Sequence, residues 1–241
     1  MKIRYDVHIH SCLSPCGDDS MTPAFIAGSA ALEGLDLVAL TDHNTAENCP
    51  AFAKAAEFYG VSALFGMELT TSEDIHVVCL FGTAEKAAEF SDYVKARHNR
   101  PKNQPEIFGR QLVMDEEDNI VREESGLLIY AADIDFETAG KTVFDMGGAA
   151  FPAHIDKTAN GAVAILGTVP DYAGYRLCEV HDAANIPEIS KFVEYRDTAY
   201  ICDSDAHYPD AIGSVNGEIV LPDGDPAEQF LIYLRRHYRR D

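Results

Sequence analysis

One stretch near the N-terminus decides the fold, Ile3-Arg4-Tyr5-Asp6-Val7-His8-Ile9-His10. Alternate side chains of a β-strand face the same way, so Asp6, His8 and His10 are expected to point together from a strand over residues 3–10. Two imidazoles at this spacing can hold one metal ion, and imidazole suits Zn, Mn, Fe or Ni. Taken alone, the pattern also fits a solvated strand face, but the apolar residues between the polar ones favour a buried strand.

The same residue types recur where two further predicted strands end. Asp42 and His43 follow the apolar residues 36–40, and Glu68 closes the apolar run 61–69. A carboxylate among apolar neighbours is costly unless it is paired or ligated, and Glu68 could bridge two metals through its two oxygens. Each site alone has an ordinary explanation, a turn for His43 and an exposed strand end for Glu68.

Three more strand boundaries carry such residues. They are His76 at the start of residues 75–81, His154 at the end of 149–154, and Asp205 with His207 after 199–203. Accidental polar residues would also be scattered over helices, yet only His98 and His237 of the nine histidines fall in predicted helices, where we expect them to be solvated. His181 ends another strand and is expected at the rim or behind the ligands.

Strands alternate with helices along the chain, which predicts an α/β fold with a parallel sheet. Helices are expected from Pro23 to Gly34 and over residues 51–58, 84–98, 136–146, 187–194 and from Pro226 onward. Polar residues at the carboxyl ends of about seven strands favour a barrel with its site on that rim. We expect one domain, 1–241, with an insertion or lid-like excursion at about 99–126, where the alternation stops.

Composition limits the environment and the partners. The formal charge is -21 over 241 residues, which opposes binding of long nucleic acids and anionic membranes, although bound cations would leave a small phosphate ligand possible. No apolar run approaches the ~20 residues that cross a bilayer, and no signal peptide precedes residue 3, so we expect a cytoplasmic protein with free thiols.

The ordered set of motifs resembles the PHP (polymerase and histidinol phosphatase) family. The matching residues are Asp6-x-His8-x-His10-Ser11, Thr41-Asp42-His43, Gly66-x-Glu68, His76, Pro152-Ala153-His154 and Ser204-Asp205-Ala206-His207. Each piece is weak, but the set in this order is highly specific. The resemblance implies a distorted (βα)7 barrel with a polynuclear metal site at the carboxyl-terminal rim of the strands.

The resemblance also implies a ligand set for two or three divalent ions, Zn, Mn or Fe. His8, His10, Glu68 and Asp205 would hold the first ion, and Glu68 would bridge to a second held by His76 and His154. A third would use His43, His207 and one residue of the loop after His10. Asp6 and Asp42 would lie behind the ligands and orient imidazoles.

The loop after His10 departs from the family pattern, which usually offers His or Asp there. Cys16 takes the expected place if Pro15 is a one-residue insertion, and a thiolate would favour zinc or iron. Asp18 or Asp19 could reach the metal instead, or the third site could be weak or empty.

The predicted activity is that of a metal-dependent phosphoric ester hydrolase. Metal-activated water would attack a small phosphate ester, such as a nucleotide, a short oligonucleotide or a sugar or amino-alcohol phosphate. We expect Glu68, Asp205 and His207 to be catalytic, with Asp205 or a histidine relaying the proton. Lys157 and Arg110 are candidate substrate-binding cations.

Three alternatives stay open. An amidohydrolase also uses His-x-His on a barrel strand, although Glu68 stands where a bridging lysine would, and Lys54 and Lys86 lie in predicted helices. The chain could be a non-catalytic, metal-binding regulatory module, or it could act on short oligonucleotides as a nuclease. The sequence leaves open the physiological substrate, the metal and the oligomeric state.

Overall fold

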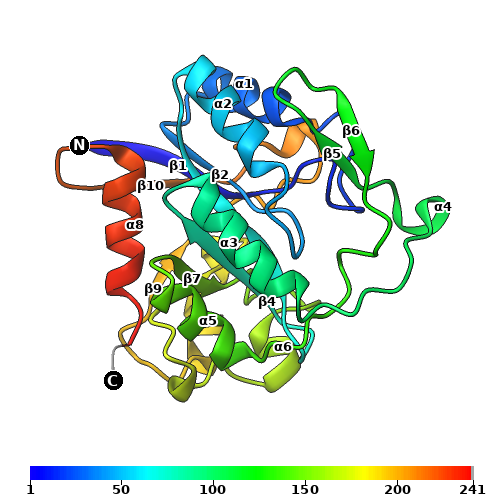
Figure 1. The fold of residues 1–241 in the computed structure, drawn as a ribbon. Coiled ribbons are helices and arrows are strands. Elements are labelled where there is room, and N and C mark those ends of the chain that lie inside the picture. The colour runs from blue at the N-terminus through cyan, green and yellow to red at the C-terminus, as the bar shows by residue number, and fades with distance from the viewer. Residues whose placement is uncertain (240–241) are drawn as a thin grey trace.

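A six-stranded sheet in the order β10-β1-β2-β3-β4-β7 is the centre of the computed structural model, which describes residues 1–239 (Figure 1). Its strands are β1 (Lys2–Ile9), β2 (Leu37–Leu40), β3 (Ser62–Thr70), β4 (His76–Phe81), β7 (Ala149–Pro152) and β10 (Gly217–Val220). A second, parallel pair joins β8 (Leu177–Glu179) to β9 (Ala199–Ile201).

Helices lie around this sheet, as Figure 1 shows. They are α1 (Pro23–Leu32), α2 (Cys49–Tyr59), α3 (Ala84–Lys95), α4 (Pro105–Phe108), α5 (Phe136–Asp145), α6 (Ala162–Leu166), α7 (Ile186–Ile189) and α8 (Pro226–Arg236). The expected start of α1 is explained by its cap, because the Thr22 side chain accepts a hydrogen bond from Phe25 N and Pro23 follows it.

The α/β class is confirmed, but the expectation of an all-parallel sheet is wrong. β1, β2 and β3 are parallel, whereas β4 is antiparallel to both β3 and β7, and β10 is antiparallel to β1. The link between β3 and β4 is too short for the crossover that a parallel pair needs. As a result His76, at the start of β4, lies opposite Thr70 at the end of β3, on the same rim as the other polar strand ends.

The sheet curls into a half-barrel, and the β8–β9 pair lies near its open side. Ile9 forms a parallel bridge with Ala206, and His10 N donates to Ala206 O at 2.9 Å. Two carboxylates add to this seam: Val7 N donates to Asp203 Oδ1 at 2.7 Å, and Ser204 N donates to Asp6 Oδ1 at 3.1 Å. The seven-strand count of the resemblance stays a prediction.

Two apolar layers hold the sheet in place. One lies between the sheet and helices α1, α2, α3 and α5, and includes Ile26, Phe52 and Phe90. The other fills the concave side, where α8 closes it with Phe230, whose ring centroid is 4.7 Å from that of Tyr5. Because both faces are packed, the polar rim is the part of the sheet left for chemistry.

Residues 99–126 contain short regular elements, although no long periodic segment was expected there. They hold α4 and a hairpin of β5 (Leu112–Met114) and β6 (Ile120–Glu123). The hairpin packs on the loop that follows β1, since Leu112 N donates to Cys12 O at 2.9 Å and both side chains are buried together. Figure 1 shows α4 at the edge of the molecule, and a lid role for this segment stays a prediction.

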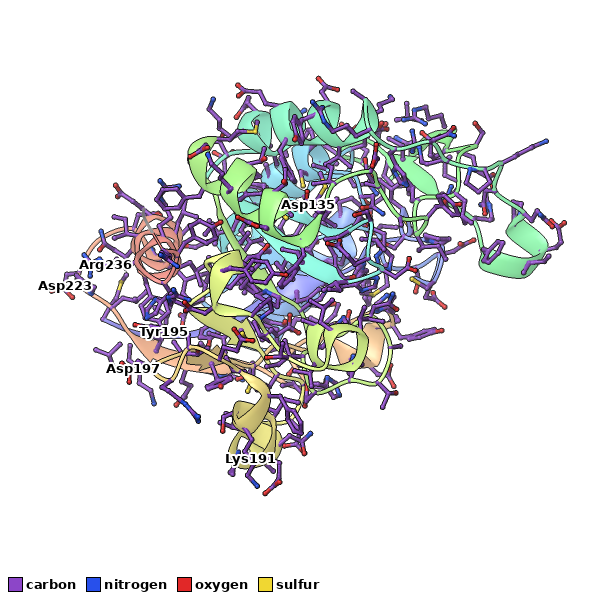
Figure 2. The ribbon with its side chains drawn as sticks, turned by 90° about the horizontal axis from the view of Figure 1, so that it is seen from below. Asp135, Lys191, Tyr195, Asp197, Asp223 and Arg236 are labelled. Atoms are coloured by element: carbon purple, nitrogen blue, oxygen red, sulfur yellow. The ribbon has the colours of Figure 1, made fainter. Side chains whose placement is uncertain are left out.

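Two local expectations need correction. The helix expected over 187–194 is a succession of short turns, α7 and a 3-10 turn (Ser190–Phe192), which lie at the periphery near the labelled Lys191 in Figure 2. His98 is buried instead of solvated, because the chain leaves α3 at Lys95 and places His98 Nε2 2.5 Å from Tyr130 O. Among residues 1–239, no helix combines the length and the apolar character that a membrane span requires.

Candidate metal centre

Four side chains from three parts of the rim meet at one point. Nε2 of His8 and Nε2 of His10 are 3.2 Å apart. Asp205 Oδ1 lies 3.4 Å from the nitrogen of His8 and 3.3 Å from that of His10. Glu68 Oε1 lies 3.4 Å from His8 Nε2, and Glu68 Oε2 lies 3.3 Å from His10 Nε2. These four side chains are close enough for a single ion to contact all of them.

Glu68 is the hub of the centre. Its Oε1 lies 2.8 Å from His76 Nδ1 and 3.0 Å from His154 Nε2. Its Oε2 lies 3.1 Å from His43 Nδ1. With a side chain that is 1% exposed, Glu68 presents each oxygen to a different group of imidazoles, as a bridging carboxylate would.

The donor atoms form three overlapping groups. They are His8-His10-Glu68-Asp205, His43-Glu68-His76 and His10-His43-His207. The first equals the set implied by the resemblance. In the second, His43 stands beside His76, although His154 also contacts Glu68 Oε1, and the third contains His10 where a residue of the following loop was expected.

Hydrogen bonds behind the rings fix which imidazole nitrogens can bind a cation. Ser14 Oγ donates its single proton to Asp42 Oδ1 at 2.8 Å, so it must accept from His10 Nδ1 at 2.9 Å. Glu179 Oε2 accepts from His8 Nδ1 at 2.7 Å. When these rings are neutral, both Nε2 atoms are bare, and two lone pairs 3.2 Å apart are stable only if a proton or a cation lies between them. The residues therefore fit a bound metal ion.

The charges in the centre also favour a bound metal ion. Burial alone would lower the pKa of His10, but hydrogen bonds and charges from Asp205 and Glu68 raise it to about 9. Burial is likewise outweighed at His8, where Glu179, Glu68 and Asp205 raise the pKa well above its usual value. The metal-free centre thus holds protons where a cation would be held, so metal binding displaces protons.

Two other imidazoles stay neutral and available. Burial, and then the charge of His10, lower the pKa of His207 to about 4. Burial lowers the pKa of His43 well below its usual value in spite of the nearby Glu68. Neutral imidazole is the form that binds metals, so both rings are suited to ligation near pH 7.

The backbone is strained at the centre. The backbone of Asn44, His154 and Asp205 has φ values of 54, 28 and 52°. Residues other than glycine rarely adopt this left-handed region. At Asn44 this backbone conformation is held by three hydrogen bonds: the amide donates to Leu128 O and Tyr130 O, and Oδ1 accepts from Thr70 N. His154 and Asp205 belong to the centre themselves, and Asn44 follows His43 directly.

The sequence reasoning missed two buried carboxylates behind the ligands. Glu179 contacts His8, and Asp203 holds Val7 N, with neither side chain exposed. Glu179 Oε1 and Asp203 Oδ2 have no hydrogen-bond partner among the described residues. Burial, Glu179 and Asp6 raise the pKa of Asp203 well above its usual value. A carboxylate inside the apolar run Leu177-Cys178-Glu179-Val180 was the available signal, the same argument that picks out Glu68.

Asp6 is buried but does not point together with His8 and His10. A shift of register between Asp6 and Ile9 interrupts the alternation of β1, so its carboxylate does not join the two histidines. It accepts from Ser204 N and Gly213 N instead and so holds the loop that carries Asp205. Asp42 does support an imidazole, through Ser14 to His10.

The candidate ligands of the loop after His10 do not join the described ligand groups. Cys16 is exposed, and its thiol belongs to none of the described ligand groups. Asp18 Oδ1 accepts from Ser20 N and Oγ, and Asp19 pairs with Arg110 at 3.3 Å. The loop therefore offers the centre none of its three candidates in this conformation.

A cavity of about 170 Å³ opens onto the centre. Its wall holds His43, Glu68, His76, His154, Lys157, Ala159, Asn160, Asp205 and His207. Lys157 is its one lysine or arginine among the described residues, and Nζ lies 2.7 Å from Asp205 Oδ2. Arg110 is not brought to this cavity, because it is exposed and pairs with Asp19 and with Glu123 at 3.6 Å.

Comparisons with known proteins agree with this geometry. Over 92 residues, 38% of this chain, the sequence is 32% identical to the error-prone DNA polymerase of Symbiobacterium thermophilum, and the match covers 8% of that polymerase. The fold is similar to that of endonuclease Q from Pyrococcus furiosus, described as a lesion-specific endonuclease, with a TM-score of 0.67 and 18% identity. That alignment covers 98% of this chain but 56% of the endonuclease.

A third similarity is to an amidohydrolase from Chromobacterium violaceum, with a TM-score of 0.59, 20% identity and 92% of each chain covered. At such identities the likeness to both solved structures is one of fold. The sequence model of the PHP domain matches residues 6–161, which is more than half of the chain and includes His8, His10, His43, Glu68, His76 and His154. The chain belongs to the PHP domain family.

Proposed function

We propose that this protein is a metal-dependent phosphoesterase that hydrolyses a small phosphate ester. The observation that carries the proposal is the pairing of a His-Glu-Asp centre fit for divalent ions with a single lysine on the described wall of the same cavity. His8, His10, Glu68 and Asp205 would hold one ion, and Glu68 would share its second oxygen with ions held by the remaining imidazoles. Bound ions would lower the pKa of a coordinated water toward neutrality and polarise phosphoryl oxygens.

The chain's own residues would bind the phosphate group and set the charge around it. Lys157 Nζ donates to a phosphate oxygen from the cavity wall, a role suited to an ammonium group whose present partner is Asp205. His207 is neutral near pH 7, because burial and His10 hold its pKa near 4, so its ring is free to bind an ion or accept a hydrogen bond. Asp205 stays ionised, because the two imidazoles outweigh burial and hold its pKa well below the usual value.

The size of the cavity favours a small reacting group. Its volume of about 170 Å³ is below the ~300–1,000 Å³ of pockets that enclose a whole drug-sized ligand. A phosphoryl group fits, and the rest of the substrate would lie outside on the surface of a chain with net charge -21. Long duplex DNA, with its dense negative charge, is disfavoured by the same surface.

The test is a panel of aryl phosphate monoesters, aryl phosphate diesters, aryl esters and short single-stranded oligonucleotides, assayed after loading with Mn, Zn or Fe. Glu68→Gln keeps the shape of the hub and removes its charge, so phosphate ester turnover should fall at least about a thousandfold. The matched control is Glu218→Gln, an exposed strand glutamate paired with Lys2, which should retain turnover. Equal turnover in both variants, or no turnover of any phosphate ester with full metal loading, would refute the proposal.

An amidohydrolase is the second candidate, favoured by the fold likeness to the Chromobacterium protein. Turnover of lactones or amides by the loaded protein, without turnover of phosphate esters, would establish it. Full loading with no turnover of any class would favour a non-catalytic metal-binding module.

A further inference from the structure

Asn48 stands at the start of α2 but does not cap this helix. Asparagine at such a position commonly accepts a hydrogen bond from the first turn, whereas the Asn48 side chain makes no capping bond. Instead Nδ2 donates to Ser11 Oγ at 2.9 Å and to Leu112 O at 3.1 Å, and Oδ1 accepts from Met114 N at 2.9 Å. The buried amide therefore joins the loop after β1 to the distant strand β5.

The backbone of β5 fixes which way round the amide of Asn48 lies. A carbonyl oxygen can only accept a hydrogen bond and a backbone N–H can only donate one, so Leu112 O must face Nδ2 and Met114 N must face Oδ1. The opposite orientation would set two acceptors against each other, and two donors likewise. The second proton of Nδ2 is therefore directed at Ser11 Oγ.

This proton sets the direction of the hydrogen bonds at Ser11. The hydroxyl oxygen accepts from Asn48 Nδ2 and from Leu13 N, the latter at 3.2 Å, and these two bonds fill both of its lone pairs. Its own proton is left to donate to Asp42 Oδ2 at 2.6 Å. Because Ser11 N also donates to Asp42 Oδ1 at 2.7 Å, Ser11 holds both oxygens of Asp42 as acceptors.

The same direction continues to His10. Ser14 Oγ accepts from His43 N at 3.1 Å and donates to Asp42 Oδ1 at 2.8 Å, so its remaining lone pair faces His10 Nδ1 at 2.9 Å. A neutral His10 ring then carries its proton on Nδ1 and leaves Nε2 bare toward Glu68. Every side chain from Asn48 to His10 in this series is buried, so water has no direct access to these bonds.

From these contacts we propose that Asn48 is a positioning residue of the metal centre, which together with β5 holds His10 in the tautomer that presents Nε2 to an ion. Without the amide, Ser11 loses one of its two donors and the constraint that β5 provides. The reverse direction then becomes available, in which Ser14 donates to His10 Nδ1 and the ring carries its proton on Nε2. The inference rests on the metal centre of the proposed function, but not on the reaction at that centre.

The test begins with the zinc affinity of Asn48→Leu, measured by competition with a chelator. The replacement is close to the native side chain in size and removes all three hydrogen bonds of the amide. The dissociation constant for zinc should rise at least about tenfold, the smaller of the effects found when a partner behind a metal-binding imidazole is lost. In zinc-loaded protein, the NMR resonance of the His10 Nδ1 proton should be protected from exchange in the wild type and exchange faster in this variant.

Asn103→Leu is the matched control. Asn103 is a buried asparagine of the same segment 99–126, and its Nδ2 donates to Gly109 O at 3.0 Å, away from Ser11 and Asp42. The control should keep the zinc affinity and the protected His10 proton, although chemical denaturation should show that both variants are less stable than the wild type.

A double-variant cycle with Ser11→Ala tests whether Asn48 acts through Ser11. If it does, Asn48→Leu weakens zinc binding in the wild-type background but adds nothing in the Ser11→Ala background. Unchanged zinc affinity in Asn48→Leu, an equal loss in Asn103→Leu, or additive losses in the cycle would each overturn the proposal and leave the proposed activity standing, since no turnover is measured. A wild-type protein that binds no zinc would overturn the proposal and the metal centre together.

Discussion

Metal binding should release at least about one proton per ion at pH 7. His10 has a pKa of about 9 in the metal-free centre and is therefore protonated at pH 7, and the pKa of His8 is raised as well. An ion that binds between their Nε2 atoms must displace the proton held there. Each displaced proton makes the affinity rise about tenfold per pH unit, so the affinity should rise at least about tenfold between pH 7 and 8.

Calorimetry measures the number of released protons directly. Titration of Zn or Mn into metal-free protein, in two buffers of different ionisation enthalpy, separates the proton release from the heat of binding. The expected slope is at least about one proton at pH 7, and it falls above about pH 9, the pKa of His10. A proton release near zero at pH 7, with tight binding, would refute the assignment of His8 and His10 to one ion.

Glu179→Gln sharpens the test. Burial lowers the pKa of His8, and Glu179 is the largest of the charges that oppose it, so the variant should release fewer protons than the wild type at pH 7. Once the ligands are deprotonated, loss of the carboxylate behind the ring should also weaken metal binding about 10–100-fold. An unchanged proton count would mean that Glu179 does not act on His8 as the 2.7 Å contact implies.

Three further predictions concern pH, substrate and strain. The metal-free protein should lose stability as the pH rises from about 6.5 to 9, because the raised pKa of His10 adds stability below its unfolded value near 6.5 that is lost on the way to its folded value of about 9, about 3 kcal/mol at most. The pKa of Asp6, raised to about 6 mainly by burial, causes a separate loss that is complete near pH 6. Thermal unfolding from pH 7 to 9 measures the His10 effect, and rising stability over that range would contradict it. Lys157→Met should raise KM for a phosphate ester about tenfold or more while metal content stays the same; a loss of metal instead would assign Lys157 to the support of Asp205. Asn44→Ala removes three hydrogen bonds, two of them buried, at a residue with φ 54°. It should lower the free energy of unfolding by about 2–4 kcal/mol in chemical denaturation, and a change below about 1 kcal/mol would show that the backbone relaxes.

The cluster of polar side chains at the strand ends could be predicted from the sequence, because His, Asp and Glu residues occur where the pattern of apolar residues places strands. His8 and His10 alternate with apolar residues, and Glu68 lies near the end of an apolar run. Buried polar groups in such stretches need partners, so their meeting could be expected. His76 was placed at the right rim although it starts a strand, since β4 turns back antiparallel to β3.

Other features depend on geometry that a linear pattern does not contain. The bulge that separates Asp6 from the two histidines follows from pairing with β2, and the role of Asp203 depends on which strand lies beside β1. The ligand potential of Cys16 could not be decided from spacing, because the conformation of the loop after β1 is set by contacts with the distant β5–β6 hairpin.

The most direct test of the central claim is the position of bound ions in crystals of metal-loaded protein, located by the anomalous scattering of Mn or Zn. The account predicts one ion at ~2.0–2.2 Å from Nε2 of both His8 and His10, and at least one more that shares Glu68 with it. Fully loaded protein with no ion between His8 and His10 would contradict the account.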